Sequence, residues 1–344
     1  MFKLTSESEP KNVSSIPSGC THTIFSFHLP SSIPIPDGIY DVRIGKKTAD
    51  VDIRRIQHKS FGKVQFDPKV FTQLRYDKHG WSSHSFVQIK IPELVDASEA
   101  TGREPRIPED SHARDKAKDI ALKFVNRLIE VTRHVTWEYW VESKRYEDLL
   151  SFQLSYWDGA KIYPVVSEFF DFPGGLNMSS DHPFDMKPER LQELRTLLAD
   201  DLGIDPARVF LLNSKDACLK EDYRLAIVEA VTALETSLYR FIRLRCRSLH
   251  LSEKDLEGFI TIIGLYGTIN VTLRIVTDGF EQIDDETIQQ CNGAIAIRNK
   301  ILHKGFRDVG ATDTEQKIFA IEKMMDYLNG LIAKIGGSNE ENKQ

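Results

Sequence analysis

The sequence feature that most constrains the fold is a change of pattern at Asp205-Pro206. Upstream of it, apolar and polar residues alternate over short stretches, as they do in strands with one buried face. Downstream, apolar residues recur every three or four positions over long stretches, as they do on the buried side of helices. The aspartate can cap a helix, and the proline suits its first turn. We therefore expect an α+β protein, with a β-rich N-terminal domain followed by an all-α helical bundle.

The N-terminal part is expected to form an antiparallel sheet or a small sandwich. Five short stretches are rich in β-branched and aromatic residues and are separated by Pro, Gly and Asp. These predicted strands are Thr23–Leu29, Gly38–Ile44, Ala49–Ile56, Lys63–Phe66 and Ser85–Ile91. Asp158-Gly159, between two apolar runs, predicts a hairpin over 152–172. An apolar stripe predicts a helix over 114–134, and a proline at a first turn predicts another over 188–201.

The expected domain organisation follows from these patterns. Residues 1–18 and 337–344 are polar and are expected to be disordered tails. The sheet or sandwich occupies 19–95, and residues 96–205 form a connecting loop, helix and hairpin region that packs with it. The helical domain spans 206–336. Its helices are predicted at 206–219, 221–248, 253–264, 267–277, 285–304 and 314–335.

The composition is that of a soluble globular protein, because 41% of the 344 residues are hydrophobic and 28% are charged. No segment approaches about 20 uncharged apolar residues, and the N-terminus lacks the apolar core of a signal peptide. The four cysteines are far apart and have no metal-ligand spacing. We therefore expect a cytoplasmic protein with no membrane association, no metal and no cofactor. The net charge of -6 argues against a protein that coats nucleic acid in general, which is usually basic.

The strongest candidate site closes the predicted helix 285–304. Asn299 and His303 lie one turn apart on nearly the same line of this helix, with Arg298 beside Asn299. One arc thus carries a fixed cation, an amide and a side chain that titrates near neutral pH. Gly305 is expected to end the helix. The residues expected to turn inward are Ile288, Ala294, Ile295, Ile301 and Leu302. From spacing alone, the same arc also fits a polar rim whose basic residues suit the helix dipole.

Basic residues accompany this arc and can bind the phosphates of a nucleic acid. Three of them surround the histidine, and three share one face near the end of the predicted helix 221–248. These candidate RNA contacts are Lys300, Lys304, Arg307, Arg240, Arg243 and Arg247. Arginines on a solvated face near a helix C-terminus are an equally good account of the second set.

Two acids interrupt the apolar run of the same helix, at Glu229 and Glu235. Glu229 is a candidate supporting residue that pairs with Arg298. A simple surface glutamate is the alternative interpretation.

The run Arg298-Asn299-x-x-x-His303 resembles the RNxxxH form of the R-x4-6-H motif of HEPN domains (higher eukaryotes and prokaryotes nucleotide-binding). The helix that contains residues 224–235 resembles the earlier core helix of these small helical bundles. A variable helical stretch, the motif helix and a closing helix follow in the same order. The resemblance covers residues 206–336.

This resemblance implies a homodimer whose motif helices meet, and a metal-independent cleavage of RNA in which the ribose 2′-OH attacks the adjacent phosphate. His303 would transfer a proton, Arg298 would stabilise charge on the phosphorane, and Asn299 would orient the histidine or the phosphate. The β-rich N-terminal domain would sense a signal or target the protein, and a regulatory protein partner or signal would control the activity. The alternative is a non-catalytic HEPN-like module that dimerises or binds a nucleotide or protein. An acceptor of nucleotidyl groups fits less well, because the tyrosine that accompanies that role is here Gly305.

Overall fold

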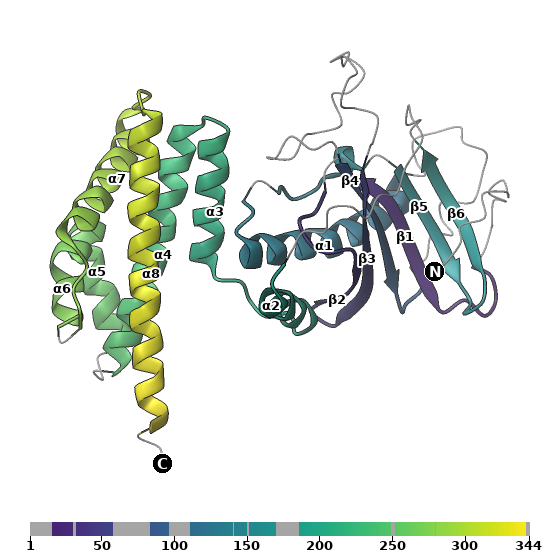
Figure 1. Ribbon diagram of the computed structural model, residues 1–344, viewed down its shortest axis with the longest axis horizontal. Helices are drawn as coiled ribbons and strands as arrows, with labels where there is room; N and C mark the ends of the chain where they lie inside the picture. The colour runs from purple at the N-terminus through teal and green to yellow at the C-terminus, as the bar shows by residue number, and fades with distance from the viewer. Residues whose placement is uncertain are drawn as a thin grey trace. The chain divides into compact units, whose positions relative to one another are not determined.

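The computed structural model describes residues 16–29, 32–57, 83–95, 111–139, 141–149, 151–169, 186–248, 252–278 and 280–341. The chain divides into two compact units, 1–203 and 204–344, next to the Asp205-Pro206 boundary (Figure 1). The first unit contains an antiparallel sheet and the second is built from helices, so the α+β expectation is confirmed. Each unit is described by itself below.

The first unit is organised around one six-stranded antiparallel sheet with the order β2-β3-β4-β1-β5-β6. The strands are β1 (His22–Leu29), β2 (Gly38–Ile44), β3 (Lys47–Gln57), β4 (Ser83–Ile91), β5 (Ser151–Trp157) and β6 (Ile162–Phe169). The predicted strand Lys63–Phe66 lies outside the described residues. The hairpin predicted around Asp158-Gly159 is present, and it extends this same sheet. A single sheet therefore accounts for all the described strands, and the sandwich expectation is not needed.

Strand β1 lies near the middle of the sheet and carries much of its core. Phe25 stands opposite Ile89 of β4 and Leu154 of β5, and all three side chains are buried. Alternate residues on these strands turn the other way, as a pleated strand with one covered face requires. The pairing of β1 with β5 joins segments more than 120 residues apart, which no local pattern could predict.

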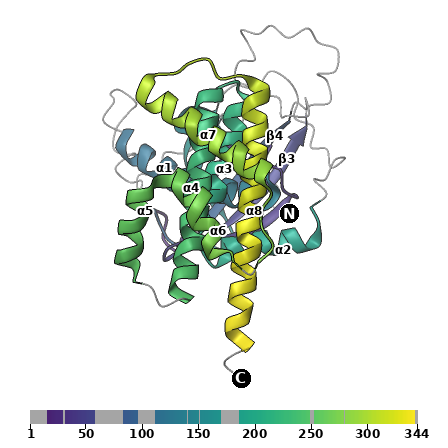
Figure 2. The same ribbon diagram turned by 90° about the vertical axis from the view of Figure 1, so that its left-hand side faces the viewer.

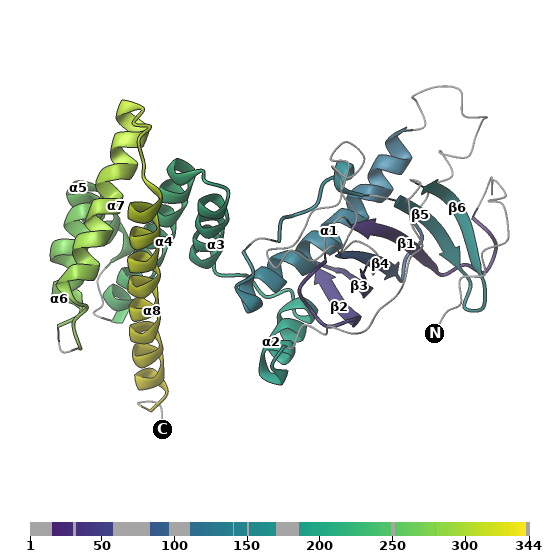
Figure 3. The same cartoon turned by 45° about the horizontal axis from the view of Figure 1, so that its top comes forward.

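Two helices complete the first unit, α1 (Ser111–Thr136) and α2 (Pro188–Ala199), with a short 3-10 turn η4 (Tyr146–Asp148) before β5. Helix α1 contacts β2, β3 and α2, and Figure 3 shows it along the sheet. Its apolar stripe includes Phe124, Leu128 and Val131, all buried as predicted. Arg127 of α1 donates a 2.6 Å hydrogen bond to the carbonyl of Leu202, which ties α1 to the end of α2.

The second unit is a bundle in which α8 packs along α3, α4 and α7 (Figure 2). The elements are α3 (Pro206–Leu219), α4 (Tyr223–Ser248), α5 (Glu253–Gly267), η5 (Thr268–Thr272), α6 (Leu273–Val276), α7 (Asp285–Lys304) and α8 (Ala311–Glu341). The bounds predicted for α3 and α7 match those observed. Helix α8 continues to Glu341, so the tail expected from residue 337 is helical over its first five residues.

The core of the bundle is formed by apolar side chains of its helices, and Leu234 near the middle of α4 is fully buried. Four of the five α7 positions expected to turn inward are buried, namely Ile288, Ala294, Ile295 and Ile301. Leu302 was assigned wrongly, because it is 53% exposed. It follows Ile301 by one position, and a step of about 100° around the helix turns it away from the core.

Candidate functional site

Helix α7 positions the motif, and contacts at both of its ends fix its length. The Asp284 carboxylate accepts a 2.8 Å hydrogen bond from the backbone N–H of Thr287. Lys323 of α8 lies 2.7 Å from the same carboxylate, and hydrogen bonds from Lys323 and Thr287 hold the pKa of Asp284 well below its usual range. At the other end, Gly305 has a φ of 62° and its N–H donates to the carbonyl of Ile301. Such a left-handed residue is a common helix end, as the sequence indicated.

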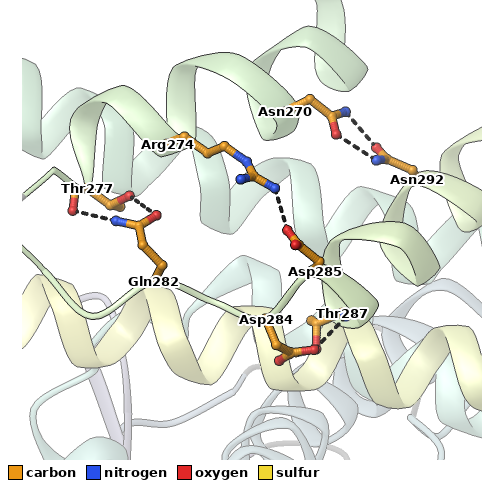
Figure 4. A network of polar contacts seen from close by, with 8 residues as sticks. All are labelled: Asn270, Arg274, Thr277, Gln282, Asp284, Asp285, Thr287 and Asn292. Atoms are coloured by element: carbon orange, nitrogen blue, oxygen red, sulfur yellow. Dashed lines mark hydrogen bonds and ion pairs between the residues drawn. The ribbon is translucent and has the colours of Figure 1, made fainter.

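Polar contacts join the first half of α7 to the preceding segment (Figure 4). Asn270 of η5 and Asn292 of α7 exchange two side-chain hydrogen bonds, of 3.0 and 2.9 Å. Arg274 of α6 lies 2.6 Å from Asp285 at the start of α7. The η5 segment is a π-helical turn, a feature that is often found at functional sites. These contacts hold α7 in register with η5 and α6, so that its second half presents the motif.

A pocket of about 580 Å³ lies between α4, α5 and α7. Arg298 and Asn299 line it from α7, and Glu235, Tyr239 and Arg243 line it from α4. Two of the motif residues therefore meet a tyrosine, a carboxylate and a second arginine from a helix that is distant in sequence. A pocket of this size suits a small molecule or a single nucleotide unit.

Helix α5 forms the third wall of the pocket through a break in its backbone. Gly264 has φ 63° and ψ 178°, a conformation essentially confined to glycine. Thr261 precedes the break, Tyr266 follows it, and both line the pocket with Gly264. The sequence indicated a break between helices here, and the structure places that break in the pocket wall.

The Arg298 guanidinium contacts two side chains, and one of its N–H donors has no hydrogen-bond partner among the described residues. Its Nη2 lies 3.9 Å from Oε2 of Glu235, and its Nη1 donates a 3.2 Å hydrogen bond to Oδ1 of Asn299. Its Nε is buried and has no hydrogen-bond partner among the described residues. A buried N–H without a partner is unfavourable, so an anion that accepted from it would be stabilised.

Tyr239 is held in its neutral form beside this pair. Burial, followed by the charge of Glu235 and a hydrogen bond to it, raises the pKa of Tyr239 to about 12. The nearby Arg298 acts in the opposite direction. The phenol therefore remains a hydrogen-bond donor at neutral pH.

Glu229 does not occupy the supporting position considered for it. The acid that pairs with Arg298 is Glu235, six residues further along α4. Glu229 hydrogen bonds to Asn213, and burial raises its pKa. Helix geometry explains the correction, because six positions along a helix turn a side chain through about 240°.

His303 lies one turn beyond Asn299 at the exposed end of α7, outside the pocket lining. Lys304 and Arg307 are also exposed, and the Lys300 ammonium lies 5.8 Å from the centre of the Phe306 ring. The structure thus brings Arg298 and Asn299 together in the pocket and places the histidine and its basic neighbours on the adjoining surface.

The three arginines of α4 differ in their surroundings. Arg243 lines the pocket. Arg240 instead lies 2.9 Å from Asp205 and donates a 2.6 Å hydrogen bond to Asn329, so it links α4 to the start of α3 and to α8. Arg247 is exposed near the end of α4. Arg243 is therefore the member of this set best placed to act with Arg298.

Sequence reasoning missed Tyr239, Thr261 and Tyr266 as site residues. A signal was present on α4, because Glu235, Tyr239 and Arg243 follow one another at intervals of four and so share a face. No comparable signal existed on α5, where the direction of the side chains depends on the break in the backbone.

Comparisons of the chain with family models, with curated proteins and with solved structures find no match. Among the described residues, no group of three or more His, Cys, Asp or Glu side chains is placed to hold a metal ion. None of the helices that the structure describes has the length and apolar character needed to cross a membrane.

Proposed function

We propose that the helical unit is a metal-independent endoribonuclease of the HEPN type that acts as a homodimer. The observation that carries this proposal is the pocket in which Arg298 and Asn299 of α7 meet Arg243 of α4, one helical turn from His303. Guanidinium groups bind phosphate through paired donors, and histidine transfers protons near neutral pH. These two abilities are what cleavage of a phosphodiester requires.

In the proposed reaction, the ribose 2′-oxygen forms a bond to the adjacent phosphorus while the bond from phosphorus to the 5′-oxygen breaks. The 2′-OH loses its proton to a general base, and the leaving 5′-oxygen gains one from a general acid. His303 performs one of these transfers. Arg298 stabilises the charge that develops on the phosphorane oxygens, and Asn299 orients the phosphate or the histidine. The products carry a 2′,3′-cyclic phosphate and a 5′-OH.

The dimer supplies what one copy lacks. A single α7 offers one exposed histidine at the edge of the pocket, whereas the reaction needs both a base and an acid. Two copies with their α7 helices facing each other would provide two histidines and two arginines in one groove. Light scattering of the full chain is expected to give twice the monomer mass, and a strict monomer at tens of micromolar would contradict the composite groove.

A non-catalytic binding module is the second candidate. It is favoured by the position of His303 outside the pocket lining and by the carboxylate of Glu235 beside Arg298. In this case the same residues would bind a nucleotide or a partner, and no bond would be broken.

Cleavage of single-stranded RNA in the presence of EDTA tests the proposal. Wild-type protein is expected to cut RNA and to leave the matching DNA intact, because the attacking group is the 2′-OH. His303→Ala is expected to lower the rate by about 100-fold or more, as for the loss of a proton-transfer group. Gln289→Ala, an exposed change at the other end of α7, serves as the matched control and should cut at the wild-type rate. If folded His303→Ala protein cuts as fast as wild type, the binding-module interpretation replaces the nuclease.

A further inference from the structure

The pocket contains aromatic and apolar side chains in addition to the groups that would bind a phosphate. Two tyrosines line it from different helices, Tyr239 from α4 and Tyr266 from α5. Ile263, Leu265 and Ile295 add apolar surface. Tyr266 is 61% exposed, so its ring is accessible to a base that enters the pocket. Aromatic side chains on which bases stack are the usual means of holding unpaired nucleotides.

Some polar groups of the pocket suit the phosphate of a nucleotide, and another suits its base. Arg243 and Arg298 can bind a phosphate. The Glu235 carboxylate is only an acceptor, so it suits the amino groups on the edges of bases. It stands 3.9 Å from Arg298, and the base and phosphate of one nucleotide could therefore contact the pair together.

We infer that the pocket between α4, α5 and α7 binds one unpaired nucleotide of the RNA next to the cleaved bond, and that it favours bases with an exocyclic amino group. Adenine, guanine and cytosine carry such a group and uracil does not. On uracil the one ring donor, N3–H, lies between two carbonyl oxygens, and these oxygens would face the Glu235 carboxylate unfavourably. This inference rests on the proposed function for its substrate class, RNA, and adds a base preference to it.

Direct binding of the four ribonucleoside 3′-monophosphates to the full chain tests the inference without depending on cleavage. Isothermal titration calorimetry is expected to give the weakest affinity for the uridine nucleotide, by about fivefold or more, the low end for one good contact to a base edge. Glu235→Gln is expected to remove this difference, because an amide can both donate and accept. Tyr266→Ala is expected to weaken all four nucleotides by about fivefold or more through lost stacking. Phe319→Ala removes a 68% exposed aromatic side chain of α8 outside the pocket lining and should change nothing.

The outcomes separate this inference from the nuclease proposal. RNA left intact by wild-type protein that still binds nucleotides with the stated preference would remove the nuclease and leave the nucleotide pocket. RNA cleavage with no measurable nucleotide binding at millimolar concentration would overturn the pocket and leave the nuclease. Equal affinities in wild type, Glu235→Gln and Tyr266→Ala would also overturn it.

Discussion

The Nη2 atom of Arg298 lies 3.9 Å from the Oε2 atom of Glu235, across the pocket between α7 and α4. This separation is too long for a hydrogen bond and short enough for the two charges to interact. The side chains are 30% and 32% exposed, so water screens the pair only in part. A loosely held, partly buried arginine is suited to exchange a carboxylate for a phosphate.

Tyr239 beside this pair predicts a loss of stability at alkaline pH. Its pKa is raised from 10 to about 12, mainly by burial, so the folded unit holds the phenol proton more tightly than the unfolded chain. The resulting stabilisation is complete below about pH 10 and is lost as the pH rises to about 12. In Tyr239→Phe, the free energy of unfolding should fall less steeply over this range. Urea unfolding followed by circular dichroism at several pH values measures the slope, and an unchanged slope would contradict the prediction. Tyr40 in the other unit titrates in the same range, so Tyr40→Phe is the background in which to make the comparison.

The elements with strong local signals were predicted well from the sequence. Helices α3 and α7 begin after an aspartate cap, and α7 ends at a glycine, so their limits are set by neighbouring residues. Strand β2 is likewise bounded by Gly38 and ends just before the turn at Gly45. In each case, the interactions that define the ends lie within a few positions along the chain.

The parts that could not be predicted depend on distant contacts. The place of β5 beside β1 requires pairing across more than 120 residues, and the Glu235–Arg298 pair joins positions 63 residues apart. The π-helical turn η5 is stabilised by the contact of Asn270 with Asn292 of another helix. The HEPN resemblance supplied the candidate arginine and histidine, but the pocket walls are formed by the packing of three helices, which a short motif does not encode.

Arg243 and Arg240 should contribute differently to RNA binding, although the sequence grouped them. Arg243 lines the pocket, and Arg240 lies outside the pocket lining, where its guanidinium contacts Asp205 and Asn329. Arg243→Ala is expected to weaken binding of single-stranded RNA and to lower the salt slope of log K by about 0.7, the value for one phosphate contact. Arg240→Ala is expected to leave that slope unchanged. Fluorescence anisotropy across a salt series measures both. Equal salt slopes in the two variants would mean that Arg240 also contacts RNA phosphates.

Leu234→Ala is expected to destabilise the helical unit by about 2–5 kcal/mol, the usual range for removing a buried leucine side chain. Leu234 is fully buried in α4, so the change leaves a cavity that its neighbours can fill only in part. Leu302→Ala is the matched control, since this leucine of α7 is 53% exposed and its loss should matter by about 0.5 kcal/mol or less. Thermal or urea unfolding gives both values. A larger effect at Leu302 than at Leu234 would mean that Leu302 is covered in solution, as it would be at a dimer interface.

Gly264→Ala should both destabilise the protein and alter the pocket. A Cβ at this position meets nothing within 4 Å, so the effect would come from the backbone alone. Alanine at φ 63° and ψ 178° is strained by about 1–3 kcal/mol, and relief of that strain would straighten α5 and move Thr261 and Tyr266. Gly258→Ala in the same helix also meets nothing within 4 Å, but there alanine should stabilise by about 0.5–1 kcal/mol. Unfolding experiments should therefore give opposite signs for the two variants, and nucleotide affinity should fall only for Gly264→Ala. If Gly264→Ala binds nucleotides as wild type does, the break in α5 has no part in forming the binding surface.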